Sequence, residues 1–288
     1  MSNVRLLEQA QVHPWYGRGL SDTGLCRQVN EDAVLTRQEA GLWVVADGVG
    51  GGSAGDRASR ALVEISAQVH VYEGLQDQLF ELEEAWLALN SQLRLYAEEE
   101  LKGRTLATTA VALILRMPWA AVLWAGDSRL YRWRQGVLQQ LTRDHSMYQQ
   151  ALDRGQSPLQ IPAELRSRIL RAVGAEDRLT LDVQLIDCQE GDRFLLCTDG
   201  VHALLADTEL EQIMALMPEL ALAHIKSRCL ALGAPDNFSF IFVSQEAAAL
   251  GAMSASIASF WPWVCSMKPA SSRPPPTLKR KSVFCRKP

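Results

Sequence analysis

Short hydrophobic runs recur along most of this sequence, and their length and composition predict β-strands. The predicted strands cover residues 18–23, 33–37, 42–46, 108–115, 120–125, 129–133, 137–141, 179–186, 193–197 and 238–243. Many neighbouring runs are separated only by short polar turns, such as the one at Gln135-Gly136. Because strands joined by short turns pair with each other in antiparallel fashion, the sequence predicts mainly antiparallel sheets.

Two long stretches instead place hydrophobic residues three and four positions apart, which is the spacing of one helix face. The first face carries Ala58, Ala61, Leu62, Ile65 and Val69, and the second carries Leu75, Leu79, Leu82, Trp86, Leu89, Leu93 and Tyr96. Shorter helices are expected at 145–154 and 220–232. These helices are grouped rather than alternating with strands, which favours an α+β fold with helices outside the sheets over a doubly wound parallel sheet.

One further helix is predicted from its first residues. Thr208-x-x-Glu211 has the spacing of a capping box, in which the two side chains satisfy backbone N–H groups at a helix start. The helix that follows would turn Leu210, Ile213, Met214 and Met217 inward.

The composition is that of a soluble globular protein. The chain has 288 residues, of which 48% are hydrophobic and 22% charged. Its six cysteines are scattered without paired spacing, which argues against a disulfide scaffold and against a zinc site. The first residues contain no hydrophobic signal-peptide core, so we expect a cytoplasmic protein. Residues 1–16 show no clear periodicity and are expected to form an N-terminal arm.

Charge is distributed unevenly along the chain. Residues 268–288 contain seven Lys or Arg and no acid, which leaves 22 basic against 33 acidic residues in the rest, a net charge of −11. An acidic body argues against nucleic acid as a partner and suits a protein that gathers carboxylates around cations. Residues 247–267 are uncharged and long enough to span a membrane, but they include four serines and Pro262. We therefore expect 246–288 to be a flexible, basic, Ser- and Pro-rich tail that could dock to a partner or a membrane surface.

Four aspartates stand at the ends of predicted strands or just before one. Asp47 and Asp199 are each followed by glycine, Asp127 follows Gly126, and Asp236 precedes the last strand. A single Asp-Gly is a common turn, but strand-end carboxylates can converge at one edge of a pair of sheets. Such a cluster would repel itself unless divalent cations were bound, and Mg²⁺ or Mn²⁺ suits oxygen ligands.

A possible phosphate ligand precedes the first of these aspartates. Arg27 is followed by the acidic pair Glu31-Asp32, and an arginine fork can bind two phosphate oxygens at once. The residue after Asp47 adds a further ligand atom, because Gly48 has no Cβ and its carbonyl can approach an ion closely. The pattern therefore suggests a site that binds both cations and phosphate.

Seven motifs, in order between about residues 17 and 243, resemble the protein phosphatase 2C family of metal-dependent phosphatases in its compact bacterial form. They are Arg27 with Asn30-Glu31-Asp32, Val45-Ala46-Asp47-Gly48-Val49-Gly50-Gly51, Thr108-Thr109-Ala110, Ala125-Gly126-Asp127-Ser128-Arg129, Thr142-Arg143-Asp144-His145-Ser146, Cys197-Thr198-Asp199-Gly200 and Asp236-Asn237. The resemblance implies a four-layer α-β-β-α sandwich over residues 17–245. It also implies a protein serine/threonine phosphatase that opposes a Ser/Thr protein kinase on phosphorylated proteins. We expect it to be a monomer.

The resemblance also assigns metal ligands by matched position. It implies that Asp47 bridges two metals and that the carbonyl of Gly48 binds one of them. Asp199 and Asp236 would hold the other. Asp127 together with Asp199 would resemble the third-metal site of bacterial members. Two or three Mn²⁺ or Mg²⁺ ions are therefore expected.

Further roles follow from the same resemblance. Arg27 would bind the substrate phosphate, and Glu31 and Asp32 would act mainly through metal-bound water. Residues 145–174 match the mobile flap beside the cleft. Some members have a histidine after the first Asp-Gly as a proposed general acid, whereas this chain has Val49. The sequence therefore does not identify the group that protonates the leaving oxygen.

Features of three other classes of protein are absent or incomplete in the sequence, and one related alternative stays open. No cysteine starts the C-x5-R pattern of a cysteine phosphatase, and no P-loop motif is present. Gly50-x-Gly52-x-x-Gly55 matches a dinucleotide-binding fingerprint, but the sequence after it is helical where a second strand is required. A catalytically weak regulator of the same fold that only binds phosphoproteins is the remaining alternative.

Overall fold

The structure is a computed structural model that describes residues 15–49 and 54–245. Most of the predicted N-terminal arm and the predicted tail at 246–288 lie outside the described residues. The strands are β1 (Tyr16–Asp22), β2 (Asp32–Arg37), β3 (Leu42–Val49), β4 (Ala107–Thr108), β5 (Ala110–Arg116), β6 (Trp119–Ala125), β7 (Arg129–Arg134), β8 (Val137–Gln140), β9 (Asp182–Asp187), β10 (Arg193–Cys197) and β11 (Phe238–Ser244). The α-helices are α1 (Gly55–Gln68), α2 (Leu75–Glu100), α3 (Met147–Asp153), α4 (Asp199–His202), α5 (Asp207–Met214) and α6 (Pro218–Ala231), with short 3-10 turns at Gln38–Ala40 and Ala163–Leu165.

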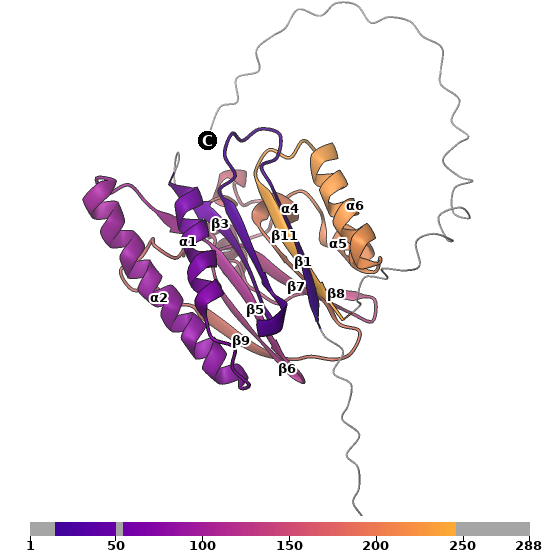
Figure 1. The fold of residues 1–288 in the computed structure, drawn as a ribbon. Helices are drawn as coiled ribbons and strands as arrows, with labels where there is room; N and C mark the ends of the chain where they lie inside the picture. The colour runs from indigo at the N-terminus through magenta and orange to yellow at the C-terminus, as the bar shows by residue number, and fades with distance from the viewer. Residues whose placement is uncertain (1–14, 50–53, 246–288) are drawn as a thin grey trace, which may run out of the picture. The chain divides into compact units, whose positions relative to one another are not determined.

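The strands form two antiparallel sheets, as the sequence predicts. One sheet has the order β1-β11-β10-β7-β8, and the other has the order β2-β3-β5-β6-β9 with β4 paired to β3. Figure 1 shows α1 and α2 on one side of the paired sheets and α4, α5 and α6 on the other. The described residues therefore form an α-β-β-α sandwich.

Three hydrophobic clusters fill the spaces between these four layers. Successive residues of β3 alternate between two of them: Leu42 and Val44 face α1 and α2, whereas Trp43 and Val45 face the other sheet. The third cluster packs β10 and β11 against α5 and α6. Because both faces of each sheet are buried, its strands are continuous hydrophobic runs with side chains that alternate in direction.

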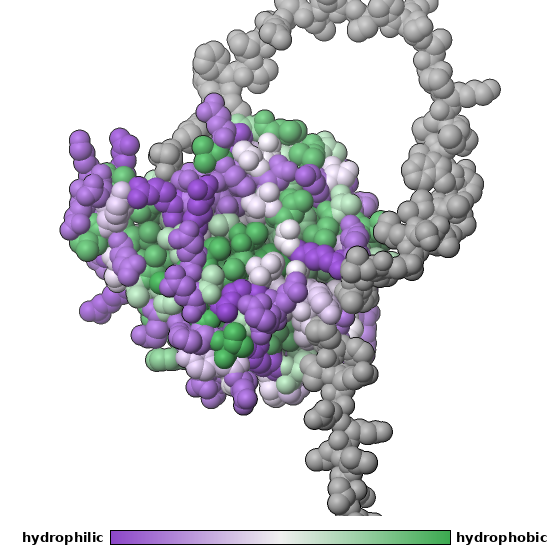
Figure 2. All heavy atoms as spheres, viewed as in Figure 1, coloured by the Kyte–Doolittle hydropathy of each residue, from purple (hydrophilic) through white to green (hydrophobic). Residues whose placement is uncertain are grey.

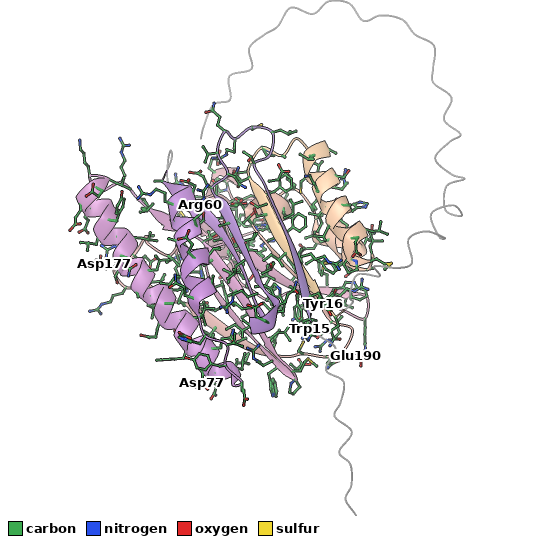
Figure 3. All side chains as sticks on the ribbon, viewed as in Figure 1. Trp15, Tyr16, Arg60, Asp77, Asp177 and Glu190 are labelled. Atoms are coloured by element: carbon green, nitrogen blue, oxygen red, sulfur yellow. The ribbon has the colours of Figure 1, made fainter. Side chains whose placement is uncertain are left out.

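The long helix α2 is amphipathic along its whole length. Trp86 is fully buried in the cluster beneath the helix, and its Nε1–H donates to Ser66 Oγ of α1 at 2.9 Å. Hydrophilic side chains gather along its outward side (Figure 2). Figure 3 places Asp77 near one end of the helix and Asp177 near the other, where Arg94 forms an ion pair with Asp177. The predicted hydrophobic face is therefore the face that packs on the sheet.

The predicted capping box at Thr208 and Glu211 is wrong. The helix α5 begins at Asp207, and no side chain caps its start. Glu211 Oε2 instead accepts a hydrogen bond from the backbone N–H of Leu138 at 2.9 Å, so a strand of the adjacent sheet uses this carboxylate. Met217, predicted to point inward, precedes α6 and is exposed, because the chain turns between the two helices.

The dinucleotide-binding alternative is not supported by the fold. After β3 the described chain continues with two helices, α1 and α2, and reaches its next strand only at Ala107. Gly50 and Gly52 of the fingerprint lie outside the described residues. A dinucleotide-binding unit needs a parallel strand directly after its first helix, and every strand pair described here is antiparallel.

The segment predicted as a flap starts and ends against the sandwich. Its first helix is α3, and the backbone N–H of Leu170 donates to the carbonyl of His145 at 2.7 Å. Val173 bridges to Thr108 beside β3. Between these anchors Leu159 is 97% exposed, whereas Ile161 is buried, so only part of the middle of the segment is free of the domain. No helix within residues 15–49 and 54–245 combines the length and hydrophobicity that crossing a bilayer requires.

Candidate metal centre

The first two carboxylates of the site face each other across neighbouring strands. In the antiparallel pairing of β2 with β3, Asp32 is the direct partner of Asp47. Directly opposed like charges destabilise a sheet, because their side chains are only about 5 Å apart. Both residues lie at the end of the sheet where the chain leaves β3. The fold therefore places two acids opposite each other at a position where two hydrophobic side chains would make the protein more stable.

Two threonines fix the backbone of Asp47. The Asp47 N–H donates to Thr109 Oγ1 at 3.1 Å, and the carbonyl of Asp47 accepts from Thr108 Oγ1 at 2.9 Å and from the Thr109 N–H at 2.8 Å. Both threonines are fully buried. The sequence identified them as part of a motif but could not assign them a role, since these bonds depend on how β3 and β4 pair.

Asp199 and Asp236 reach the same place from the other sheet. Asp199 lies two residues after the end of β10, at the start of α4, and Asp236 precedes β11. Thr198, the residue before Asp199, donates from its Oγ1 to Asp32 Oδ2, and Asp32 is the strand partner of Asp47, so the two sheets meet at these acids. Burial, followed by the charges of Asp32, Asp199, Asp127 and Asp236, raises the pKa of Asp47 well above its usual value. Residues far apart in the chain are thus brought into one acidic cluster.

Burial and neighbouring charge also raise the pKa of the other acids. Burial, with the charge of Asp236 adding to it, raises the pKa of Asp199 to about 6. Burial raises the pKa of Asp32 to about 7, although hydrogen bonds from Ser239 and Thr198 oppose the shift. Thr198 Oγ1 donates to Asp32 Oδ2 at 3.0 Å. Thr198 and Ser239 are thus polar partners of the site; the sequence showed Thr198 as part of a motif but assigned neither residue a role.

Among the four predicted aspartate ligands, Asp127 is the only one that is buried from solvent. It is 5% exposed, and its Oδ1 is buried without a hydrogen-bond partner among the described residues. Burial, then the charges of Asp199 and Asp144, raises its pKa well above the usual value. A buried carboxylate oxygen without a partner is costly, and a bound cation would remove that cost.

Arg27 and Glu31 form the rim of the cluster. Arg27 Nη2 donates to Asp236 Oδ2 at 2.7 Å, and its Nη1 lies 3.9 Å from Glu31 Oε2. The Arg27 side chain is 45% exposed, so its guanidinium can reach a ligand from solvent. The Glu31 carboxyl lies close to Gly55 at the start of α1, where an added Cβ would be 2.8 Å from Glu31 Oε1, and the sequence did not predict this contact. Burial, more than any other cause, raises the pKa of Glu31.

Asn237 ties the loop that carries Arg27 to β11. Its Oδ1 accepts from the Glu31 N–H at 2.9 Å, and its Nδ2 donates to the carbonyls of Thr23 and Val29 at 2.9 and 3.0 Å. Asn237 is almost fully buried. A side-chain amide can accept through its oxygen and donate through two N–H groups, so one Asn can join several backbone segments. Asn237 therefore fixes the position of Glu31 and Asp32 relative to Asp236.

The donor set fits hard divalent cations. Within residues 15–49 and 54–245 no three His, Cys, Asp or Glu side chains already surround a single point as metal ligands. Magnesium-type sites need only one or two carboxylates, with carbonyls and waters completing the shell. The unpartnered Asp127 Oδ1 and the opposed carboxyl groups of Asp32 and Asp47 mark positions that a cation would stabilise. The exact ligand set predicted from the sequence stays a prediction.

The raised pKa values make the stability of the metal-free protein depend on pH. In a chelator, the folded state keeps carboxyl protons that the unfolded chain has released above about pH 4. Stability must therefore fall as pH rises from about 4 through the pKa values of Asp199 (about 6) and Asp32 (about 7). Thermal unfolding in EDTA should show this fall, and Asp199→Asn should reduce it. Unfolding temperatures that stay level between pH 5 and 8 in both proteins would contradict the electrostatic description.

Known proteins resemble the whole described domain. The Protein phosphatase 2C family profile matches residues 22–226. A serine/threonine phosphatase, stp, of Listeria monocytogenes is 30% identical over 239 residues, covering 78% of this chain and 94% of the relative. The solved structure of PppA, described as a key regulatory component of T6SS in Pseudomonas aeruginosa, is 36% identical with a TM-score of 0.74 and covers 80% of this chain and 97% of its own. The catalytic domain of the phosphatase PstP, solved with 2 manganese ions, is 26% identical with a TM-score of 0.69, covering 80% and 98%.

Proposed function

The chain belongs to the protein phosphatase 2C family, and from this membership we propose that it hydrolyses phosphoserine and phosphothreonine in proteins at its aspartate cluster. Members of this family are metal-dependent enzymes, and this chain is a phosphoprotein phosphatase of the same kind. The observation that supports the position of the site best is the hydrogen bond between the two sheets from Thr198, beside Asp199, to Asp32, which is paired with Asp47.

We propose that the cations are two or three Mn²⁺ or Mg²⁺ ions. Asp47 and the carbonyl of Gly48 would hold one ion, and Asp47, Asp199 and Asp236 would hold the second. Asp127 with Asp199 would hold a third. When bound, such cations supply a water that loses its proton near neutral pH and positive charge for the phosphate oxygens. The manganese-bound PstP domain supports this choice of metals.

The remaining roles belong to the residues around the cluster. Arg27 would bind the phosphate group through the N–H groups that Asp236 does not occupy. Glu31 and Asp32 would order the waters between the carboxylates, and Thr198 holds Asp32 in place for this task. The flap segment at 145–174 would contact the substrate protein beside this cleft. Asp236, by bonding Arg27, would align the phosphate ligand with the cations.

Replacing Arg27 with lysine tests its role. Lysine keeps the positive charge but cannot form two parallel hydrogen bonds to phosphate. We expect KM for a phosphothreonine peptide to rise about tenfold, the equivalent of one charge-assisted hydrogen bond. The control is Arg94→Lys, which changes an arginine of α2 that pairs with Glu98 and Asp177. A KM equal to that of the unaltered protein would remove Arg27 from the phosphate site.

The activity itself is tested by phosphate release from phosphoserine and phosphothreonine peptides. We expect release with Mn²⁺, none after chelation, and recovery when Mn²⁺ is restored. Asp199→Asn should remove the release, whereas Asp177→Asn, which changes an exposed carboxylate beside α2, should not. Tight binding of phosphopeptides without release would instead indicate the phosphoprotein-binding regulator. Turnover that survives Asp199→Asn would show that the metal assignment is wrong.

The substrates proposed for this chain are proteins phosphorylated by a Ser/Thr protein kinase. PppA, 36% identical to this chain, is described as a regulatory component of a secretion system. That description supports a role in signalling rather than in general metabolism. Monomeric state, cytoplasmic location and docking by the tail stay predictions from the sequence.

A further inference from the structure

The motif at residues 142–146 contributes no ligand to the proposed reaction. Thr142-Arg143-Asp144-His145-Ser146 runs beside the turn Gly126–Arg129, which we call the Asp127 turn. Trp124 Nε1–H donates to the carbonyl of Arg143 at 3.0 Å, and the Leu130 N–H donates to Thr142 Oγ1 at 3.1 Å. The motif therefore holds the chain just before and just after this turn.

His145 bonds to the turn through its backbone and its ring. The backbone N–H of His145 donates to the carbonyl of Gly126 at 2.9 Å, and His145 Nδ1 accepts from the N–H of Gly126 at 3.1 Å. Gly126 has φ +114°, and a Cβ there would lie 2.6 Å from Thr109 Cβ, so the turn needs glycine at this position. Both backbone groups of Gly126 are thus bonded to one residue.

The bond at Nδ1 decides where His145 carries its proton. A nitrogen that accepts a hydrogen bond has no proton, so the neutral ring carries its proton on Nε2. Nε2–H then donates to Asp182 Oδ2 at 3.2 Å. Arg171 Nη1 lies 3.1 Å from the same nitrogen but donates to Asp182 Oδ1 at 2.5 Å, so both side chains share this carboxylate. Trp124 stacks on the ring at 6.1 Å, and burial lowers the pKa of His145.

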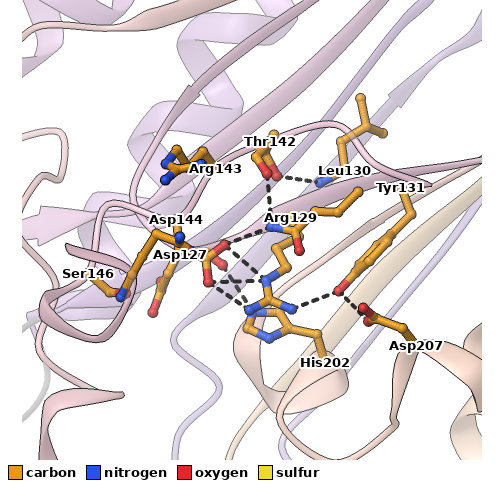
Figure 4. Close-up of polar contacts among 12 residues, drawn as sticks. Asp127, Arg129, Leu130, Tyr131, Thr142, Arg143, Asp144, Ser146, His202 and Asp207 are labelled. Carbon is orange, nitrogen blue, oxygen red and sulfur yellow. Dashed lines mark hydrogen bonds and ion pairs between the residues drawn. The ribbon is translucent and has the colours of Figure 1, made fainter. Parts of the chain in front are cut away.

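Asp144 holds the other end of the turn. Its carboxylate forms two parallel hydrogen bonds with Arg129, from Nε to Oδ1 at 2.9 Å and from Nη2 to Oδ2 at 2.7 Å (Figure 4). Arg129 Nη1 also donates to Tyr131 Oη at 2.8 Å, and Tyr131 Oη donates to Asp207 Oδ1 at 3.3 Å. The Asp144 side chain is 6% exposed, so solvent hardly weakens the pair.

The middle of the turn is held as well. His202 of α4 lies 3.0 Å from the carbonyl of Asp127, and burial lowers the pKa of this histidine to about 3, so Nε2–H of the neutral ring donates to that carbonyl. The hydroxyls of Ser128 and Thr109 are 2.7 Å apart and share a hydrogen bond. Thr109 also accepts from the Asp47 N–H, so the turn and the Asp47 backbone are linked through one hydroxyl.

The turn thus has bonded backbone groups at both ends and its centre, yet the carboxylate that it carries has a buried oxygen without a partner among the described residues. A rigid backbone that presents an unsatisfied acceptor is typical of a prepared ligand position. We propose that Asp144 and His145 are positioning residues that fix the Asp127 turn so that Asp127 Oδ1 can bind a divalent cation. This inference rests on the proposed phosphatase function.

The test compares three substitutions. His145→Leu removes the acceptor for the Gly126 N–H, whereas His145→Asn places an amide oxygen where Nδ1 was. Arg143→Ala is the matched control, because this neighbour is exposed and its side chain pairs only with Asp153 of α3 among the contacts that involve it. Mn²⁺ binding is measured by calorimetry, and the Mn²⁺ concentration for half-maximal phosphopeptide hydrolysis is measured separately.

Loss of a residue that orients a metal ligand typically weakens metal binding by about 10- to 100-fold. We expect His145→Leu to weaken the Mn²⁺ site that Asp127→Asn also removes, to raise the activating Mn²⁺ concentration by about tenfold, and to change KM for peptide little. His145→Asn should restore most of the binding, and Arg143→Ala should match the unaltered protein. In the Asp127→Asn background, His145→Leu should add no further change.

Asp144→Asn provides a second variant if His145→Leu does not fold. Asparagine keeps the size of the Asp144 side chain but removes its negative charge and one of the two oxygens that accept from Arg129. Folded variants at both positions that bind Mn²⁺ like the unaltered protein would overturn the inference and leave the phosphatase function intact. If the unaltered protein itself neither binds Mn²⁺ nor releases phosphate, the proposed function fails instead.

Discussion

Replacing Asp47 with asparagine should lower kcat for phosphopeptide hydrolysis by about a thousandfold or more. Asparagine keeps the size of the side chain and one oxygen ligand but removes the charge that would bind two cations. Metal-ion catalysis contributes several kcal/mol to transition-state stabilisation, and about 4 kcal/mol corresponds to a thousandfold in rate. The rate is measured with Mn²⁺ in excess over a range of concentrations, so that weaker metal binding and slower chemistry can be separated.

The same substitution should make the metal-free protein more stable. Burial and neighbouring acids raise the pKa of Asp47, so its charged form is disfavoured in the folded state. Asparagine removes a carboxylate that faces Asp32 in the strand pairing. Urea unfolding in EDTA at pH 8 should therefore shift to higher urea for Asp47→Asn and stay unchanged for the exposed control Asp177→Asn. A less stable metal-free Asp47→Asn protein would mean that the cluster carries no electrostatic strain.

Replacing Gly48 with alanine should distort the backbone at the site and lower the free energy of unfolding of the domain by about 3 kcal/mol. A Cβ at Gly48 would lie 2.2 Å from the carbonyl oxygen of Gly55 and 2.7 Å from that of Glu31. Both are backbone atoms that cannot rotate away, and the Gly48 N–H already donates to the Glu31 carbonyl at 3.0 Å. The strand β3, the start of α1 and the loop before β2 would therefore have to separate.

Gly19→Ala is the matched control for that prediction. Gly19 lies in β1, and the nearest atom to its added Cβ would be the side-chain atom Ile241 Cγ1 at 3.3 Å, which can move. We expect Gly19→Ala to unfold near the urea concentration of the unaltered protein and to keep its activity. If Gly48→Ala were equally stable and active, the close backbone packing beside Asp47 would not exist in solution.

The fold could be predicted largely because both faces of each sheet are buried. Leu42 to Val45 read as a continuous hydrophobic run, and in the structure they alternate between two core clusters. The helix α2 was recognisable because one face packs on the sheet over its whole length. The start of α5 was not, since Glu211 bonds to a strand that is distant in sequence, and no local pattern records that contact.

Candidate ligands could be predicted because strand ends expose their carboxylates at a sheet edge. The convergence of Asp47 and Asp199 is consistent with that reasoning. The supporting residues could not be assigned, because Thr109, Thr198 and Asn237 act through bonds between strands or loops that only the folded chain brings together. The pairing of Arg27 with Asp236 likewise joins two loops 209 residues apart.

The most direct test of the metal centre is a crystal structure with Mn²⁺, with anomalous diffraction used to locate the ions. We expect at least two manganese peaks, both in contact with Asp47 and one of them also with Asp199 and Asp236. Manganese bound elsewhere, or no peak within reach of these carboxylates at saturating Mn²⁺, would contradict this expectation.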